Sequence, residues 1–180
     1  FLKAMKQDEV QSRYKTYAKL EHYMWGSAAI VGHIMTFIVG YSDTRAFDDA
    51  RALGEAMQLA NFLRDVNEDY IERDRIYLPQ NDMTLFGVTE NMIQQQVMTK
   101  QLHNFIHHYV ERTEKLFIQG IAGIKKLQSG KFSILLASRM YRENIRILRR
   151  RNYDIFGPKI RLSKFQKVQL LLSTITMYPL

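Results

Sequence analysis

Apolar side chains recur every three to four residues along most of the chain, and no segment alternates apolar with polar residues between turn signals. The first pattern places apolar side chains on one face of an α-helix, whereas a half-buried strand needs the second. The sequence therefore predicts an all-α protein. The expected helices cover residues 13–40, 44–73, 89–128, 131–151 and 163–176.

Residues that break helices mark the limits of these elements. We expect the helix 13–40 to bend near its glycines, and the helix 89–128 to be interrupted around Gly120 and Gly123. Two segments are rich in turn residues such as Pro, Asn and Gly, and such residues favour irregular backbone over helix. The expected loops are therefore 74–88 and 152–162.

Two of the helices carry capping signals at their starts. Asp43 or Thr44 can cap the helix 44–73, because short polar side chains accept hydrogen bonds from the free N–H groups of a first turn. Ser163 and Gln166 have the spacing of a capping box, in which each residue bonds the backbone of the other. We therefore expect the last helix to begin at Ser163.

The composition is that of a globular protein and limits its chemistry. Hydrophobic residues make up 46% and charged residues 24% of the 180 residues, which suits one domain over 1–180 with a sizeable core. The absence of cysteine excludes a disulfide framework, thiolate-ligated zinc, an iron–sulfur cluster and a thiol nucleophile. The formal net charge of +8 favours an anionic partner: a phosphorylated small molecule, a membrane surface or nucleic acid.

The segment 24–41 contains no Asp, Glu, Lys or Arg. Its 18 residues are at the short end of what a helix needs to span a bilayer, and its Gly, Ser, Thr and His residues lower its hydropathy. Three interpretations stay open: a membrane span, a buried helix that packs tightly through small residues, and a helix that lines an apolar cavity. We favour the two interpretations as a buried helix over the membrane span.

The expected helix 44–73 carries a polar stripe. Gly54, Gln58, Asn61, Asp65 and Asp69 follow one another at intervals of 4, 3, 4 and 4 residues, which places them on one side of a helix. The apolar residues of the segment point elsewhere and are expected to pack. They are Leu53, Ala56, Leu59, Ala60, Leu63 and Val66.

The polar stripe ends in two carboxylates, Asp65 and Asp69, one helical turn apart. Bare carboxylates at this spacing repel each other. A solvated surface pair is one explanation. A divalent cation is the other, since Mg²⁺ binds through one or two carboxylates together with water and substrate phosphate oxygens. The residues by themselves leave both explanations open.

The run ALGEAMQLANFLRDVNEDYIERDRIYLP (52–79) strongly resembles the second aspartate-rich region of the phytoene/squalene synthase family. The run YMWGSAAIVG (23–32) is similar to a Tyr-containing, small-residue helix of that family. The run SRMYRENIRILRRRNYDIF (138–156), followed by Arg161, is similar to its C-terminal signature. The resemblance covers nearly the whole chain.

The resemblance implies an isoprenoid-synthase-like helical bundle and a Mg²⁺-dependent prenyltransferase, with Mn²⁺ as an alternative metal. Members of the family join two prenyl diphosphates, farnesyl or geranylgeranyl, head to head through a cyclopropylcarbinyl diphosphate. The segments DVNED and RIYLP look closer to the branch that makes phytoene or a dehydrosqualene-type product in carotenoid biosynthesis. That branch implies no NADPH-dependent step.

The resemblance also implies roles for particular residues. Asp65 and Asp69 match metal ligands, and they are expected to be catalytic together with Tyr23, Arg75 and Tyr77. The residues that match positions near the diphosphate or the reacting carbons are Tyr23, Gln58, Asn61, Arg75, Tyr77, Tyr141 and Arg161. The residues expected to line the cavity for the prenyl chain are Ala28, Val31 and Gly54.

The first aspartate-rich motif of the family matches nothing in this chain. We therefore expect the chain to correspond to roughly the C-terminal two thirds of a family member, with N-terminal helices and half of the metal site missing, and to be inactive alone. The rival from another class is a non-catalytic scaffold or assembly factor that kept the fold. We rank it second, because such a protein would be expected to lose Asp65 and Asp69.

Basic residues crowd the expected helix 131–151. We favour a solvated basic face over attraction to anionic lipid headgroups, and we expect no nucleic acid, because no nucleic-acid motif accompanies the arginines. The expected location is the cytoplasm, with attachment to a membrane surface as an open alternative. The arginines are Arg139, Arg142, Arg146, Arg149, Arg150 and Arg151.

Three residues of the expected helix 89–128 have the spacing of metal ligands: His103, His107 and Glu111. No HExxH motif accompanies them, so we favour surface histidines over a zinc site. Large aromatic residues on the same helix are expected in the core rather than in a binding site. They are Phe105, Tyr109 and Phe117.

Overall fold

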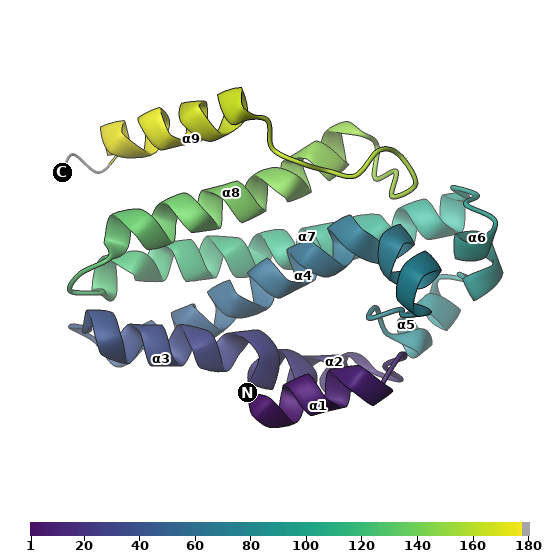
Figure 1. Ribbon diagram of the computed structural model, residues 1–180, viewed down its shortest axis with the longest axis horizontal. Coiled ribbons are helices and arrows are strands. Elements are labelled where there is room, and N and C mark those ends of the chain that lie inside the picture. The colour runs from purple at the N-terminus through teal and green to yellow at the C-terminus, as the bar shows by residue number, and fades with distance from the viewer. Residues whose placement is uncertain (178–180) are drawn as a thin grey trace.

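A computed structural model describes residues 1–177, which form packed helices (Figure 1). The helices are α1 (Leu2–Val10), α2 (Tyr17–Met24), α3 (Ile30–Val39), α4 (Ala46–Arg73), α5 (Gln80–Leu85), α6 (Glu90–Gln94), α7 (Lys100–Gly123), α8 (Lys131–Arg150) and α9 (Lys164–Met177). A π-helical turn, η1 (Trp25–Ala29), and a 3₁₀ turn, η2 (Ile124–Lys126), complete them. Residues 1–177 contain no β-strand, so the all-α prediction is confirmed.

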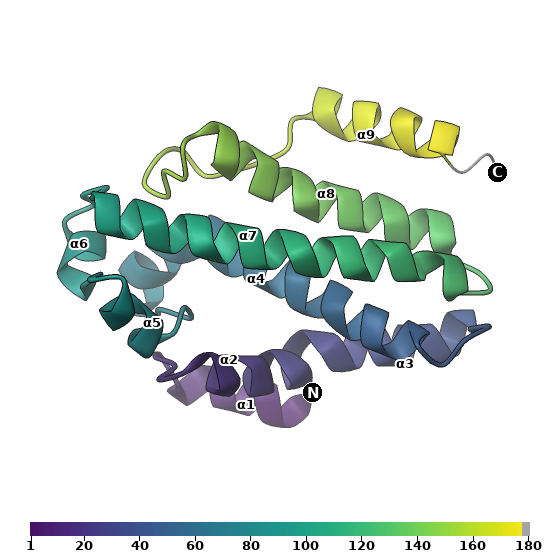
Figure 2. The same cartoon turned by 180° about the vertical axis from the view of Figure 1, so that it is seen from behind.

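Three long helices form the centre of the molecule. α4, α7 and α8 lie side by side, with α1, α2 and α3 on one side and α9 on the other (Figures 1 and 2). The apolar stripe of each long helix is turned inward, where removal of apolar surface from water stabilises the fold. The predicted core residues are buried: Leu53, Ala56, Leu59, Ala60, Leu63, Val66, Phe105, Tyr109 and Phe117.

The predicted helix 13–40 is divided by the π-helical turn. α2 ends at Met24, the turn η1 follows, and α3 continues from Ile30. The turn lies where the sequence predicted a bend near glycines. A Cβ on Gly26 would lie 2.8 Å from the Cβ of Ala4. The missing side chain therefore lets α1, which is absent from the predicted helices, pack against the turn.

The predicted interruption is wrong at Gly120, which lies inside α7, but the α-helix does end at Gly123, where the 3₁₀ turn η2 follows. Another break in the segment lies upstream, at 95–99, where Thr99 caps α7. A Cβ on Gly120 would lie 2.6 Å from the Cβ of Leu53. Gly120 therefore permits close approach of α7 to α4 rather than ending the helix.

One of the two capping predictions is wrong and the other is confirmed. Arg45 is the N-cap of α4 and gives no side-chain cap; the Asp43 carboxylate accepts a hydrogen bond from the Arg45 N–H at 2.8 Å. At the start of α9, the Ser163 N–H donates to Gln166 Oε1 at 2.8 Å, and the Gln166 N–H donates to Ser163 Oγ at 3.1 Å. This reciprocal pair is the predicted capping box.

One of the two predicted loops is confirmed and the other is wrong. Residues 152–162 contain no helix, as expected, whereas the segment 74–88 holds the short helix α5. Within residues 1–177, no helix combines the length and the apolar character that crossing a membrane requires. The interpretation of 24–41 as a membrane span is therefore wrong for the described chain.

Candidate functional site

An apolar cavity of about 320 Å³ lies between α3, α4, α7 and α8. One face of α4 lines it from Ala46 to Asn61, and η1 and α3 form the facing wall. The lining includes the residues that the resemblance assigned to the prenyl chain or the reacting carbons, together with an aromatic residue of α8. These residues are Ala28, Val31, Gly54, Gln58, Asn61 and Tyr141.

The segment 24–41 both lines this cavity and packs tightly. A Cβ on Gly54 would lie 3.0 Å from the carbonyl oxygen of Ala28, and a Cβ on Gly32 would lie 2.7 Å from that of Ala50. The small residues therefore bring the backbones of α3 and α4 together at these points and leave the cavity between them. The helix packs closely and lines the cavity on one face, but it is not buried as predicted, because Ile34, Phe37 and Ile38 are exposed on the other face.

A second pocket, of about 500 Å³, adjoins the apolar cavity at Tyr141, which lines both. We call it the cationic pocket, because four basic residues from α4, the loop after α8, and α9 line it. They are Arg64, Lys159, Arg161 and Lys167. Asn144 of α8 adds a side-chain amide. A cluster of such donors attracts an anion, phosphate oxygens in particular.

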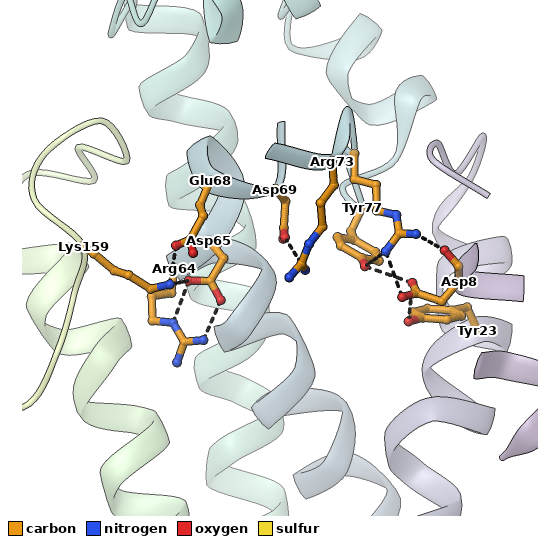
Figure 3. A network of polar contacts seen from close by, with 10 residues as sticks. Asp8, Tyr23, Arg64, Asp65, Glu68, Asp69, Arg73, Tyr77 and Lys159 are labelled. Carbon is orange, nitrogen blue, oxygen red and sulfur yellow. Dashed lines mark hydrogen bonds and ion pairs between the residues drawn. The ribbon is translucent and has the colours of Figure 1, made fainter. Parts of the chain in front are cut away.

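Asp65 lies beside the basic residues of this pocket. Its carboxylate accepts hydrogen bonds from Arg64 at 2.8 and 2.5 Å and lies 3.9 Å from Lys159 Nζ. Lys159 is also bonded to Glu68, so a residue of the loop after α8 is tied to α4 (Figure 3). The polar stripe of α4 therefore leaves the apolar cavity at Asn61 and reaches cationic surroundings at Asp65.

Asp69, one turn further along α4, is 8% exposed and pairs with Arg73 at 3.3 Å. Burial, and secondly the charge of Asp65, raise the pKa of Asp69 to about 6, although Arg73 and Arg75 act in the opposite direction. A raised carboxyl pKa means that the surroundings stabilise the negative charge less well than water does. A bound cation would supply that stabilisation.

Tyr23, Arg75 and Tyr77 meet around Asp8 of α1 (Figure 3). The Asp8 carboxylate accepts hydrogen bonds from the Tyr23 hydroxyl at 2.8 Å, the Tyr77 hydroxyl at 2.9 Å and the Arg75 guanidinium at 2.9 Å. Burial raises the pKa of Tyr77 to about 12, and burial with the Asp8 hydrogen bond raises that of Tyr23. Both hydroxyls therefore hold their protons at neutral pH.

The predicted site residues form neighbouring groups rather than one open cleft. The lining of the apolar cavity contains Tyr141 but, among the described residues, not Tyr23. Asp69 instead shares a small crevice with Arg75 and Tyr77. In Figure 3, Asp69 lies between the Asp65 group and the tyrosines. Helix α4 therefore connects the groups through its two carboxylates.

Five polar residues of these groups were not predicted from the sequence: Asp8, Arg64, Asn144, Lys159 and Lys167. Asp8 meets an arginine 67 positions away, and Lys159 meets a glutamate 91 positions away. No local spacing encodes such pairs. The excess of basic residues between Tyr141 and Lys167 was the available signal, because such clusters favour anion binding.

The acid pair of α4 fits part of a magnesium site. In the described chain, no group of three or more His, Asp or Glu side chains gathers as metal ligands. Asp65 and Asp69 supply two carboxylates one turn apart, and the raised pKa of Asp69 indicates a charge in need of compensation. Mg²⁺ commonly takes one or two protein carboxylates and completes its shell with water and phosphate oxygens. The donor set suits that ion.

The other metal prediction concerned His103, His107 and Glu111, which form no metal cluster within residues 1–177. His103 Nε2 lies 3.1 Å from Asn152 Oδ1, and His107 Nε2 lies 3.8 Å from Glu111. The surface interpretation of these histidines therefore holds.

The predicted solvated basic face of α8 holds for part of its arginines: Arg146, Arg149 and Arg150 are exposed, but every arginine of the predicted set also has a polar partner. Arg142 and Arg149 pair with acids of α7, Glu114 and Glu111. Arg139 donates to two hydroxyls of α9, and Arg151 donates to the Pro158 carbonyl. The remaining ion pairs are those of Arg146 and Arg150 with Glu143. The contacts of Arg139, Arg142 and Arg149 therefore tie α8 to α9 and α7, whereas those of Arg146 and Arg150 lie within α8.

Residues 1–166 match the model of the squalene/phytoene synthase family. A phytoene synthase of Thermus thermophilus is 35% identical over 159 residues, which cover 88% of this chain and 54% of that protein. A 15-cis-phytoene synthase of Synechococcus elongatus is 28% identical over 180 residues, which cover 93% of this chain and 58% of that protein. The chain spans a little over half the length of these curated relatives.

Solved structures show the same likeness. A dehydrosqualene synthase determined with a ligand superposes with a TM-score of 0.88 at 31% identity, covering 99% of this chain and 63% of that one. A squalene synthase from Alicyclobacillus acidocaldarius superposes with a TM-score of 0.77 at 27% identity, covering 84% of this chain and 58% of that one. The isoprenoid-synthase-like helical fold is therefore confirmed for the described residues.

Proposed function

Because the chain belongs to the squalene/phytoene synthase family, we propose that it carries the prenyl diphosphate site of a head-to-head prenyltransferase. The observation that carries the proposal is the shared border at Tyr141, where an apolar cavity meets a cationic pocket. A prenyl diphosphate has the same division into an apolar tail and an anionic head. The prenyl tail lies in the cavity and the diphosphate in the pocket.

Each part of the site contributes one action. Arg64, Arg161 and Lys167 bind the diphosphate, whose negative charge grows as the allylic carbon–oxygen bond breaks. Gln58 and Asn61 lie at the border and orient the reacting end of the tail. The apolar walls exclude water, so that the allylic cation meets the alkene of a second substrate instead.

Asp65 and Asp69 would hold Mg²⁺, or Mn²⁺ in its place. When bound, the cation supplies positive charge that stabilises the departing diphosphate. On the other side of Asp69, Arg75 and the protonated hydroxyls of Tyr23 and Tyr77 donate hydrogen bonds to the Asp8 carboxylate. Asp8 orients these three donors through the contacts described above.

The product class proposed for the complete enzyme is phytoene or a dehydrosqualene-type hydrocarbon, formed without NADPH. The support for this class is the likeness to phytoene and dehydrosqualene synthases. We expect the 180-residue chain alone to bind substrate without turnover, because its two grouped carboxylates provide few protein ligands for divalent cations.

A membrane surface is the second partner that we propose, because tail and product are lipids. Helix α9 exposes the apolar residues Phe165, Val168 and Leu172 beside the exposed lysines Lys164 and Lys167. Apolar side chains next to lysines suit the headgroup region of an anionic bilayer. The expected location is cytoplasmic, at such a surface.

Binding of non-hydrolysable farnesyl and geranylgeranyl thiodiphosphates, measured by isothermal titration at several Mg²⁺ concentrations, tests the proposal. Asp65→Asn should weaken Mg²⁺-dependent binding at least about tenfold, which corresponds to ~1.4 kcal/mol. Glu68→Gln is the matched control, because it removes a neighbouring carboxylate of α4 that bonds Lys159. In a complete, active enzyme, Asp65→Asn should reduce diphosphate release by about 10²–10³.

Two results would contradict the proposal. Absence of binding by the unmodified chain at every Mg²⁺ concentration would favour the non-catalytic scaffold. Equal losses in Asp65→Asn and Glu68→Gln would show that Asp65 has no particular role with the metal. A melting curve without metal accompanies both variants, so that unfolding is not mistaken for lost affinity.

A further inference from the structure

The apolar cavity has two distinct ends along α4. Ala28 lies beside Gly54, and Gly32 lies beside Ala50, so α3 and α4 run in opposite directions along its walls. Tyr141 and Asn61 mark the end that adjoins the cationic pocket. At the other end, which we call the far end, four residues meet. They are Ala46, Asp49, Ile124 and Leu127.

The far end of the otherwise uncharged cavity lining contains one member of an ion pair. Asp49 is the one charged residue in the lining of the cavity as described, and its carboxylate is bonded to Lys126 Nζ of η2. Their side chains are 13% and 21% exposed. A Cβ on Gly123 would lie 2.1 Å from the Cβ of Asp49. The glycine therefore leaves the room in which Asp49 lies against the end of α7.

We propose that the Asp49–Lys126 ion pair is the end wall of the cavity and sets the longest prenyl tail that the site accepts. The inference rests on the proposed function and adds a specificity-determining pair to it. Asp49 and Asn61 are twelve residues apart on α4, which is about 18 Å at 1.5 Å per residue. An isoprene unit extends about 5 Å, from four carbon–carbon bonds of ~1.5 Å. At about 5 Å per isoprene unit, the length of about 18 Å accepts a prenyl tail of three to four isoprene units.

The ion pair stops the tail for two physical reasons. Asp49 lines the far end with Lys126 bonded to it, and a tail that reached Asp49 would remove the remaining water from both charges. Removing water from a charge without adding a hydrogen-bond partner is unfavourable. A longer tail therefore gains no further apolar contact at this end and instead displaces charged groups.

The test measures affinity against tail length. The probes are thiodiphosphates with tails of two to five isoprene units, titrated with Mg²⁺ into the unmodified chain and into the double variant Asp49→Ala/Lys126→Met. Both charges are removed together, because one alone would leave its partner unpaired. We expect affinity for the unmodified chain to fall at least tenfold beyond its longest accepted tail. In the double variant, the longest accepted tail should become longer by one isoprene unit or more.

A matched control is Asp48→Ala, because Asp48 is the exposed neighbour of Asp49 in the same turn. It should leave the length limit unchanged. If the double variant fails to fold, Ala46→Met serves, because it fills the far end from a buried position. This variant should weaken binding of the longest accepted tail at least tenfold and leave the two-unit tail unaffected.

The outcomes separate this inference from the function on which it rests. An unmodified chain that binds none of the probes overturns both. A chain that binds them, with the same length limit before and after the far end is changed, overturns the end wall alone. A purely structural ion pair would shift the melting temperature of the variant without moving the length limit.

Discussion

At the scale of single residues, Asp69 shows how a site can be formed at the expense of stability. Its side chain lies in a crevice with Phe62, Val66 and Ile76, where water cannot fully solvate a charge. Arg73 and Arg75 only partly offset this burial, so the pKa remains raised at about 6. A residue that is poorly solvated in the free protein is ready to bind a cation.

This environment predicts a pH dependence of folding. The pKa of Asp69 is about 6 in the folded chain and about 4 in an unfolded one. The folded state binds the proton more tightly, so stability should fall as pH rises from about 4 to about 6 and stay level above. The difference of about two units corresponds to on the order of 3 kcal/mol. Asp69→Asn should remove this slope and stabilise the metal-free chain at pH 7.

Urea unfolding between pH 4 and pH 8, without divalent cations, measures this effect. Added Mg²⁺ should raise the midpoint of the unmodified chain at pH 7 more than that of Asp69→Asn. Parallel pH profiles for the two proteins would show that Asp69 is adequately solvated in the fold.

At the scale of elements, small residues decide how closely α4 meets its neighbours. Gly120 of α7 faces Leu53 of α4, and Gly54 of α4 faces Ala28 of η1. These contacts involve backbone atoms, which cannot rotate aside as a long side chain can. The separation of the helices, and with it the width of the apolar cavity, therefore depends on the absence of a few Cβ atoms.

Gly120→Ala tests this dependence. The new Cβ would lie 2.6 Å from the Cβ of Leu53 and 2.8 Å from its backbone nitrogen, so α7 and α4 must separate. Overpacking of this kind typically costs about 1–3 kcal/mol, against up to ~1 kcal/mol gained from helix propensity. We expect a net loss in the free energy of unfolding by urea.

Gly157→Ala is the comparison, because a Cβ there would lie no closer than 3.4 Å to any neighbour and the position is outside the helices. It should change stability by less than about 0.5 kcal/mol. If Gly120→Ala were as stable as the unmodified chain, α7 and α4 could separate at no cost in the free energy of unfolding, which would contradict this prediction.

At the scale of the whole molecule, α9 is attached differently from the central helices. It packs on α8 through few buried residues, Leu170 and Thr174. Arg139 of α8 donates hydrogen bonds to Thr174 at 2.8 Å and to Ser173 at 2.9 Å. In Figures 1 and 2, α9 lies at the outer edge of the molecule, beyond α8. Its position therefore depends on a small number of polar contacts.

Amide hydrogen exchange should reveal this arrangement. We expect the amides of α9 to exchange faster than those of α7, because few buried contacts resist local opening. Arg139→Ala should accelerate exchange in α9 about tenfold or more, which corresponds to the loss of ~1.4 kcal/mol of local stability. Exchange in α7 should not change.

Arg149→Ala is the control, since Arg149 pairs with Glu111 of α7 and does not contact α9. Acceleration of the same size in both variants would show that the charge of α8, rather than the contacts of Arg139, holds α9.

The sequence by itself determined the helical class, the extent of α4 and α8, and the polar stripe from Gly54 to Asp69. These features depend on periodicity within one element, which the chain carries locally. It also determined the capping box at Ser163, because both partners lie within four residues. The predicted interruption at Gly120 was wrong, since a local rule for helix breaking does not include the partner helix.

Only the tertiary structure decided in which environment each residue of the polar stripe lies. Gln58 and Asn61 face the apolar cavity, Asp65 adjoins cations, and Asp69 is buried, although all follow one helical spacing. Their neighbours come from α1, α3, α8 and the loop before α9, and burial and charge at each position depend on those neighbours. The contacts of Asp8 with Tyr23 and Tyr77, and of Asp49 with Lys126, arise for the same reason, because packing joins residues that no sequence interval relates.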